Sequence, residues 1–227
     1  MENPSFALRG RRSEFPLNGT GDVPDGLRLA VSRMSASGPQ AERSYQEALD
    51  LVRSQPAAEV ARTLAEAARE LPEDAYLERI SLAQVATDIR DGALVDFLQA
   101  VVAAGLPPER GTADGHGFST VAREVVIRMV AVEGLARLAA DGSAGAAESL
   151  LAAVGHENRT VRAAAVAALQ ELGGAYEEQL RERIAPEDHD LLEIRRLRIE
   201  DVPQPEGGTY VNNPGAGEDI SPPSITR

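Results

Sequence analysis

Apolar residues recur every three to four positions through the central part of the chain, which is the period of an amphipathic helix. In residues 57–71, Val60, Leu64 and Leu71 fall on one helical face. Residues 74–90 carry a wider apolar face, so we expect that helix to be largely buried. The pattern predicts helices over residues 25–34, 41–54, 57–71, 74–90, 93–104, 119–140, 144–154, 159–172, 175–184 and 187–199.

Proline and glycine divide the chain into three parts. Residues 203–227 hold nine Pro or Gly residues, so we expect an extended or disordered tail there. Residues 1–22 are polar and interrupted by Pro and Gly, which predicts an irregular N-terminal arm. Residues 23–202 between them form the predicted helical domain. Inside it, residues 105–117 contain four Gly and two Pro and are predicted to be a loop insertion.

Two stretches of the helical domain resemble each other. Arg128 and Leu135 are matched by Arg162 and Leu169, 34 residues later. Self-similarity at such a period is typical of stacked helical repeats. These repeats bind partners along an extended surface.

The unit formed by residues 146–174 resembles a HEAT repeat. It has a short first helix, a turn, and a second helix that opens on Val161-Arg162 and continues through small residues to Leu169. The resemblance is clearest over residues 119–174. It implies an all-α fold, a short right-handed α-solenoid of about three to four HEAT-like helical pairs, with the helices before residue 55 as an N-terminal cap. An irregular all-α bundle with one repeat-like hairpin is the structural alternative.

The HEAT resemblance also implies a polar ladder between repeats. Arg128 and Arg162 occupy the position of the ladder arginine, and its acidic partner normally lies a few residues upstream. Glu124 stands at that offset from Arg128, where it also forms an i,i+4 pair. Asn158 occupies the same offset from Arg162, so this unit departs from the acidic pattern.

The composition narrows the possible chemistry. The chain has no Cys, Trp or Lys, which excludes disulfides, thiolate nucleophiles, Schiff-base lysines and the lysine of phosphate-binding loops. A composition rich in Ala, with Arg as its only strongly basic residue, is typical of a GC-rich bacterial genome. Neither a signal sequence nor an apolar run of membrane-spanning length is visible, so we expect a cytoplasmic protein.

The net charge of −13 bears on the choice of partner. An acidic surface repels phosphate backbones and anionic membranes, so we expect neither a nucleic acid nor a membrane as partner. A protein with a basic surface is favoured. The sequence leaves the oligomeric state open.

No constellation of residues predicts catalysis, a metal or a cofactor. His116, His156 and His189 are not spaced as metal ligands are. The unusual loop and the tail are the places where a partner could bind, because loops carry many binding residues. The candidate partner-binding residues are Glu109, Arg110, Asp114, His116, Tyr210 and Asn212.

We therefore expect a non-enzymatic protein–protein interaction module, a scaffold or adaptor subunit, rather than an enzyme. Enzymes similar to HEAT proteins include alkylpurine DNA glycosylases and bilin lyases. The glycosylase activity needs a basic, aromatic-lined groove, which an acidic chain without Trp does not favour. A ligand-handling enzyme of the bilin-lyase type is the alternative that stays open.

Overall fold

The computed structural model describes residue 17 and residues 20–111 and 119–193, all within the first of two units that divide after Ile194. The all-α prediction is confirmed: the described residues form α-helices and 3-10 helices and contain no strand. The helices are α2 Asp22–Met34, α3 Ala41–Arg53, α4 Ala57–Glu70, α5 Tyr76–Ile89, η2 Gly92–Leu94, α6 Val95–Ala103, α7 Thr120–Ala140, α8 Ala144–Ala153, α9 Arg159–Glu171, η3 Gly174–Tyr176, α10 Glu177–Arg183 and η4 Pro186–Leu192.

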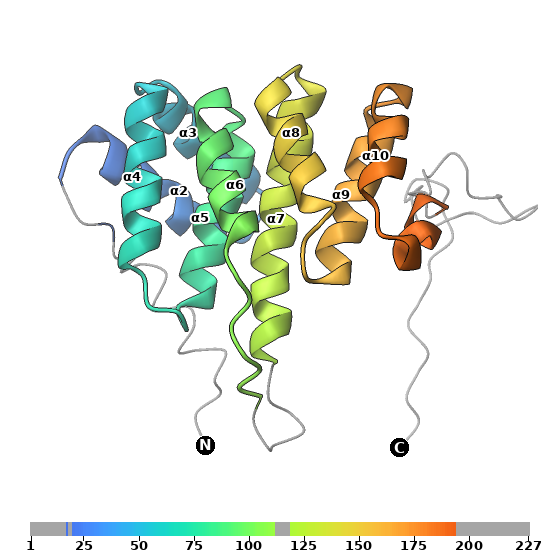
Figure 1. Ribbon diagram of the computed structural model, residues 1–227. Helices are drawn as coiled ribbons and strands as arrows, with labels where there is room; N and C mark the ends of the chain where they lie inside the picture. The colour runs from blue at the N-terminus through green and yellow to red at the C-terminus, as the bar shows by residue number, and fades with distance from the viewer. Residues whose placement is uncertain (1–16, 18–19, 112–118, 194–227) are drawn as a thin grey trace, which may run out of the picture. The chain divides into compact units, whose positions relative to one another are not determined.

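From α4 onward the helices of this unit form two layers (Figure 1). Helices α5, α7 and α9 lie side by side in one layer. Helices α4, α6, α8 and α10 follow one another in the second layer and pack on the first. At the N-terminal end, α2 and α3 pack on each other and on α5. Helices α4, α6 and α8 of the second layer are thus followed along the chain by α5, α7 and α9 of the first.

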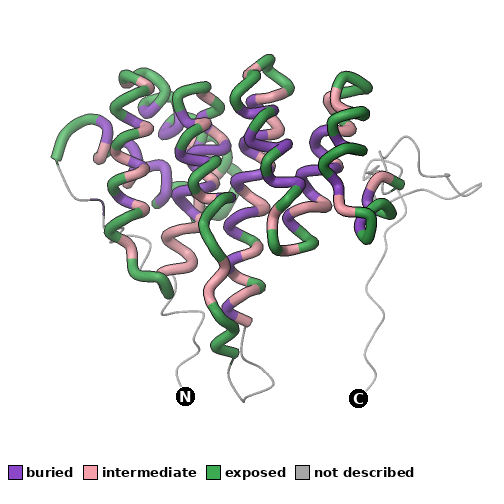
Figure 2. Tube along the Cα trace, viewed as in Figure 1, coloured by how far each residue is buried: buried purple, intermediate pink, exposed green. Residues whose placement is uncertain are grey.

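The buried positions lie mainly where the two layers face each other (Figure 2). Most of the buried apolar residues are Leu, Val and Ala. Small residues allow the helices to approach closely. An added Cβ at Gly134 of α7 would lie 2.6 Å from Thr87 Oγ1 on α5 and 2.9 Å from Leu98 Cδ1 on α6. Glycine is therefore required where these three helices meet.

Helix ends follow the local sequence. The hydroxyl of Ser119 accepts a hydrogen bond from the Ala122 N–H and begins α7, and Asn158 does the same for α9 through the Thr160 N–H. These caps meet backbone N–H groups that the first helical turn leaves without a partner.

The predicted boundaries need three corrections among the described residues. The first helix begins at Asp22, so the predicted arm 1–22 overlaps it by one residue. The predicted helices 93–104 and 175–184 each begin as a 3-10 turn, η2 and η3. The predicted helix 187–199 is a 3-10 helix as far as Leu192, and its remaining residues from 194 lie outside the described residues. Periodicity does not separate 3-10 from α geometry in so short a segment.

The predicted insertion joins α6 to α7. Residues 105–111 have no regular secondary structure, and residues 112–118 lie outside the described ranges, as does the predicted boundary at residue 203. Within the described ranges, every helix is too short or too polar to span a bilayer.

Candidate functional site

Three arginines at equivalent positions make the same contact. Each lies on a first-layer helix, Arg79 and Arg162 at its fourth residue and Arg128 at its ninth. Each donates to backbone carbonyls in the connection that precedes its helix. The accepting carbonyls belong to Glu73 for Arg79, to Ala104 and Gly105 for Arg128, and to His156 and Glu157 for Arg162, at donor–acceptor distances of 2.6–3.1 Å. Each arginine therefore ties one connection to its own helix.

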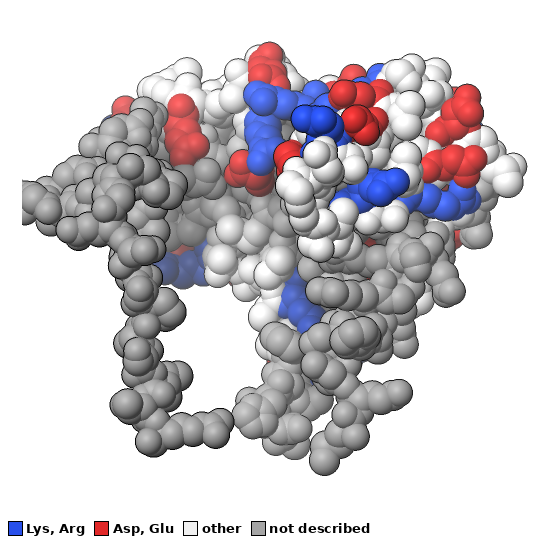
Figure 3. Space-filling view, turned by 180° about the vertical axis from the view of Figure 1, so that it is seen from behind, with Lys and Arg blue, Asp and Glu red and all other residues white. Residues whose placement is uncertain are grey.

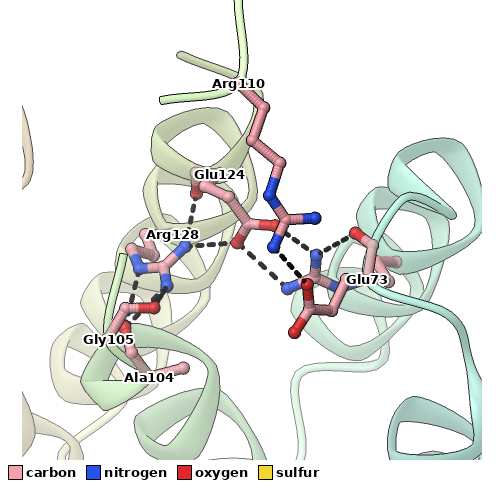
Figure 4. Close-up of polar contacts among 7 residues, drawn as sticks. Glu73, Ala104, Gly105, Arg110, Glu124 and Arg128 are labelled. Atoms are coloured by element: carbon pink, nitrogen blue, oxygen red, sulfur yellow. Dashed lines mark hydrogen bonds and ion pairs between the residues drawn. The ribbon is translucent and has the colours of Figure 1, made fainter. Parts of the chain in front are cut away.

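Two of these arginines share a buried carboxylate (Figure 4). Glu124 is 2% exposed and Arg128 1% exposed. Glu124 Oε2 accepts from Arg128 Nη1 at 2.7 Å and from Arg79 Nη2 at 3.0 Å. Burial by itself raises the pKa of the Glu124 carboxyl, but the hydrogen bonds from the two guanidinium groups outweigh it and hold the pKa below its usual value of 4.5. The carboxylate thus links α5 to α7.

The third arginine is paired differently. Arg162 Nε lies 2.7 Å from Oδ2 of Asp188 in η4, a carboxylate that also accepts from Arg159. The side chain of Asn158 caps α9 instead. The acid that faces Arg162 therefore comes from the following element and not from the upstream position. Sequence reasoning missed Asp188, because no local pattern relates it to Arg162.

The described loop residues are engaged within the chain. The Glu109 carboxylate accepts from the Thr120 N–H at 2.8 Å and from the Ser119 hydroxyl, so it closes the N-terminus of α7. The Ser119 hydrogen bond lowers the pKa of the Glu109 carboxyl. Arg110 is exposed and lies 3.1 Å from Glu73. The other candidate partner-binding residues lie outside the described residues: Asp114, His116, Tyr210 and Asn212.

An apolar strip lies on the outer face of α5, α7 and α9. We define it as Leu77 and Ile80 of α5, Val126 and Met129 of α7, and Ala163 of α9. Val126 is 48% exposed, and the other four side chains are half-buried. The spacing that relates Arg79 to Arg128 also relates Leu77 to Val126 and Ile80 to Met129. The spacing that relates Arg128 to Arg162 relates Met129 to Ala163.

Helices α5 and α7 run parallel, so these equivalent residues are neighbours. Arg79 pairs with Glu124 near the start of the two helices, and Arg90 pairs with Asp141 just past their ends. Between these pairs, Thr87 Oγ1 donates to the Val130 carbonyl at 3.0 Å. The strip therefore crosses the N-terminal halves of the layer rather than being scattered over it.

An acidic edge follows on the C-terminal halves of the same helices. We define it as Asp88, Glu133 and Glu171. Arg137 Nη1 lies 3.1 Å from Asp88 Oδ1, and Arg137 Nε lies 3.1 Å from Glu133 Oε1. Two carboxylates thus accompany the Arg137 guanidinium group, and Arg53 Nη2 donates to the Asp88 carbonyl at 2.6 Å. Burial, and next the hydrogen bond to Asp88, raises the pKa of Tyr45, which donates its hydroxyl to Asp88 Oδ2 at 2.8 Å.

Most of the other arginines in the described residues also form ion pairs with Asp or Glu. In the view from behind, Arg side chains alternate with Asp and Glu in the upper part of the molecule (Figure 3). Pairing of this kind cancels the positive charge locally. That face carries a mixed charge pattern rather than the continuous basic field that nucleic acids favour.

A groove of about 300 Å³ lies between the C-terminal ends of α6 and α8. Small side chains such as Ala103 and Ala152 line it, and His156 and Glu157 are among its polar groups. His156 Nδ1 accepts from the Asn158 N–H at 2.9 Å, which places the proton of the neutral ring on Nε2. Burial, and next the charge of Arg128, lowers the pKa of His156, so the ring is neutral at physiological pH.

In the part of the chain that the structure describes, no group of three or more His, Cys, Asp or Glu side chains is arranged to hold a metal ion. No protein-family model, curated protein or solved structure matches the chain. The assignment of a function therefore rests on the geometry of this chain.

Proposed function

We propose that this chain is a HEAT-like, right-handed α-solenoid that acts in the cytoplasm as a non-enzymatic protein-interaction module. Three features support the repeat assignment. The helices follow one another in two layers, equivalent residues recur on α5, α7 and α9, and the three equivalent arginines bind the preceding connections in the same way. Repeats of this kind stack so that one helix of each pair contributes to a common surface.

The observation that carries the proposal is the apolar strip. Val126 and Leu51 are the large apolar side chains that are exposed among the described residues. Val126 has Leu77 at the equivalent position of α5 and lies next to the row Ile80, Met129 and Ala163, whereas α9 has Thr160 at its own equivalent position. Exposed apolar patches rimmed by polar residues mark interaction sites. Burying one such side chain at an interface contributes about 1.5–3 kcal/mol. The strip therefore suits a scaffold or adaptor subunit that holds a partner protein.

The test compares two charge substitutions in the tagged full-length chain. Val126→Glu places a carboxylate in the strip, whereas Leu51→Glu places one at an equally exposed apolar position on α3, outside the strip. We expect a stoichiometric partner to co-purify with the wild type and the Leu51→Glu chain and to be lost with Val126→Glu. Equal recovery with all three chains would contradict the proposal, provided that circular dichroism shows equal helix content.

The groove between α6 and α8 supports a second candidate, a ligand-handling enzyme of the bilin-lyase type. Its volume of about 300 Å³ is at the lower end of the range for small-molecule sites, roughly 300–1,000 Å³. The protein purified from its source would then carry a bound tetrapyrrole and absorb visible light. A colourless preparation that does not bind added bilin would reject this candidate.

A further inference from the structure

We infer that the partner segment is an amphipathic helix with basic residues along one side, and that it lies across α5, α7 and α9. This inference rests on the proposed interaction function and specifies its partner class. The apolar face of the partner helix covers the apolar strip, and the Arg or Lys residues of that helix point toward the acidic edge. The juxtaposition of these two surfaces on the same three helices is the feature that selects such a partner.

The apolar strip provides the first half of the argument. Leu77 and Ile80 are half-buried, and Val126 is nearly half exposed, so each retains apolar surface that a partner can remove from water. The strip is two residues deep on α5 and α7, where Gln84 and Glu133 occupy the next turn, and one residue deep on α9. A partner that matches it therefore presents a narrow apolar face, as an amphipathic helix does.

The acidic edge provides the second half. Asp88 and Glu133 pair with Arg137, and the exposed Glu171 occupies the position of α9 that is equivalent to Arg137. Arg53, which donates to the Asp88 carbonyl, is itself paired with Asp50, so the edge keeps a net negative charge. The described part of the chain as a whole is also acidic, with 28 Asp and Glu against 16 Arg. Basic side chains beside the apolar face of the partner compensate this negative charge, whereas acidic segments are repelled by it.

The width of the surface matches a short helix. Packed helices lie about 8–10 Å apart, so α5, α7 and α9 together span roughly 20 Å from axis to axis. A helix rises about 1.5 Å per residue, so ~13 residues cross all three. The row runs across the helices, so the partner helix crosses them at a steep angle.

The test uses a defined probe, a 14-residue helical peptide with Leu on one face, Arg on the adjacent side and one terminal Trp. The chain contains no Trp, so Trp emission reports the peptide alone. We expect saturable binding by the full-length chain, weakened at least about tenfold in Val126→Glu. Val126→Glu adds a negative charge, so adventitious binding of a cationic peptide would instead become stronger.

Two further comparisons isolate the charge requirement. A peptide with Glu in place of every Arg should bind at least about tenfold more weakly than the Arg peptide. Glu171→Gln should weaken the Arg peptide severalfold at low salt, and this difference should vanish at about 0.5 M salt. Equal binding of the Glu and Arg peptides, or undiminished binding by Val126→Glu, would overturn the inference.

The outcome also separates this inference from the proposed function. If Val126→Glu loses a natural partner while the Arg peptide fails to bind the wild type, the strip is an interface and the partner class is wrong. If Val126→Glu instead converts a dimer into a monomer, the occupant is a second copy of the chain, and the inference is again overturned.

Discussion

At the scale of single residues, Arg128 shows how one side chain serves several elements. Its guanidinium donates to the Glu124 carboxylate and to carbonyls in the connection that follows α6, while 1% of the residue stays exposed. Desolvation of a charge is costly unless hydrogen bonds compensate for it. The side chain is therefore part of the core, although sequence composition places arginine at the surface.

Arg128→Met tests this arrangement. The substitution keeps an unbranched side chain but leaves the Glu124 carboxylate buried beside Arg79 alone, and two carbonyls lose their donor. We expect a loss of about 3–5 kcal/mol in the free energy of unfolding, measured by urea denaturation. Arg79→Met is the matched control and should cost less, because Arg79 is more exposed and Arg128 still faces the carboxylate. A smaller loss of unfolding free energy in Arg128→Met than in Arg79→Met would contradict the buried network.

His156 predicts a pH dependence. Its pKa is lowered in the folded chain, so between that pKa and the ordinary value of 6.5 the unfolded chain binds more protons. The stability contributed by the neutral ring is therefore present above pH 6.5 and is lost as the pH falls below that value. His156→Gln should remove this decline in melting temperature between pH 7 and 5. An equal decline in the wild type and in His156→Gln would contradict a role of His156. Glu124 acts separately, since its lowered pKa affects stability only below about pH 4.5.

At the scale of elements, helix packing depends on where small residues stand. Gly134 lies inside α7, where propensity alone favours alanine by about 1 kcal/mol. The close approach of Thr87 from α5 and Leu98 from α6 reverses that preference. A glycine that weakens a helix in isolation therefore stabilises the contact of three helices.

Gly134→Ala should destabilise the protein by about 1–3 kcal/mol, because the added methyl forces side chains or helices to shift. The control is Gly145→Ala in α8, where the new Cβ would lie at an ordinary 3.7 Å from Val95 Cγ1. The melting temperature should fall in Gly134→Ala and stay equal or rise in Gly145→Ala. A stabilised Gly134→Ala chain would show that α5, α6 and α7 do not approach as described.

At the scale of the whole described unit, contacts between helices that are neighbours in space connect α2 to η4 without a gap. The carboxylate of Glu124 links α5 to α7, and that of Asp188 links η4 to α9. Arrays whose units contact only their neighbours depend on these interfaces for cooperative unfolding. We therefore expect damage near the C-terminal end to affect the N-terminal end.

Leu169→Ala tests that coupling. Leu169 of α9 is fully buried, so its truncation leaves a cavity and should cost about 2–5 kcal/mol. Tyr45 lies at the other end of the unit, and it is the only tyrosine left to report by fluorescence when Tyr76, Tyr176 and Tyr210 are replaced by Phe in both proteins compared. Circular dichroism reports all helices. Both signals should shift to the same lower urea midpoint. Separate midpoints would show that the C-terminal helices unfold independently.

Some features follow from the sequence by itself. Helix positions are encoded by the spacing of apolar residues, and the caps at Ser119 and Asn158 and the break at 105–111 by local backbone preferences. The equivalence of Arg128 and Arg162 is also visible as a 34-residue period. These are properties of neighbouring residues in the chain, which is why periodicity and turn chemistry detect them.

Other features were decided only by the tertiary structure. Asp188 faces Arg162, Glu124 joins Arg79 to Arg128, and Glu109 caps α7 instead of remaining available to a partner. The contacts of Asp188 with Arg162, Glu124 with Arg79 and Glu109 with Thr120 each join residues more than ten positions apart, which no local pattern relates. The contact of Glu124 with Arg128, by contrast, is the i,i+4 pair that the sequence shows. The apolar strip, too, was decided only by the tertiary structure. Its residues look like ordinary core positions in the sequence, and only the packing of α5, α7 and α9 leaves them on an outer face.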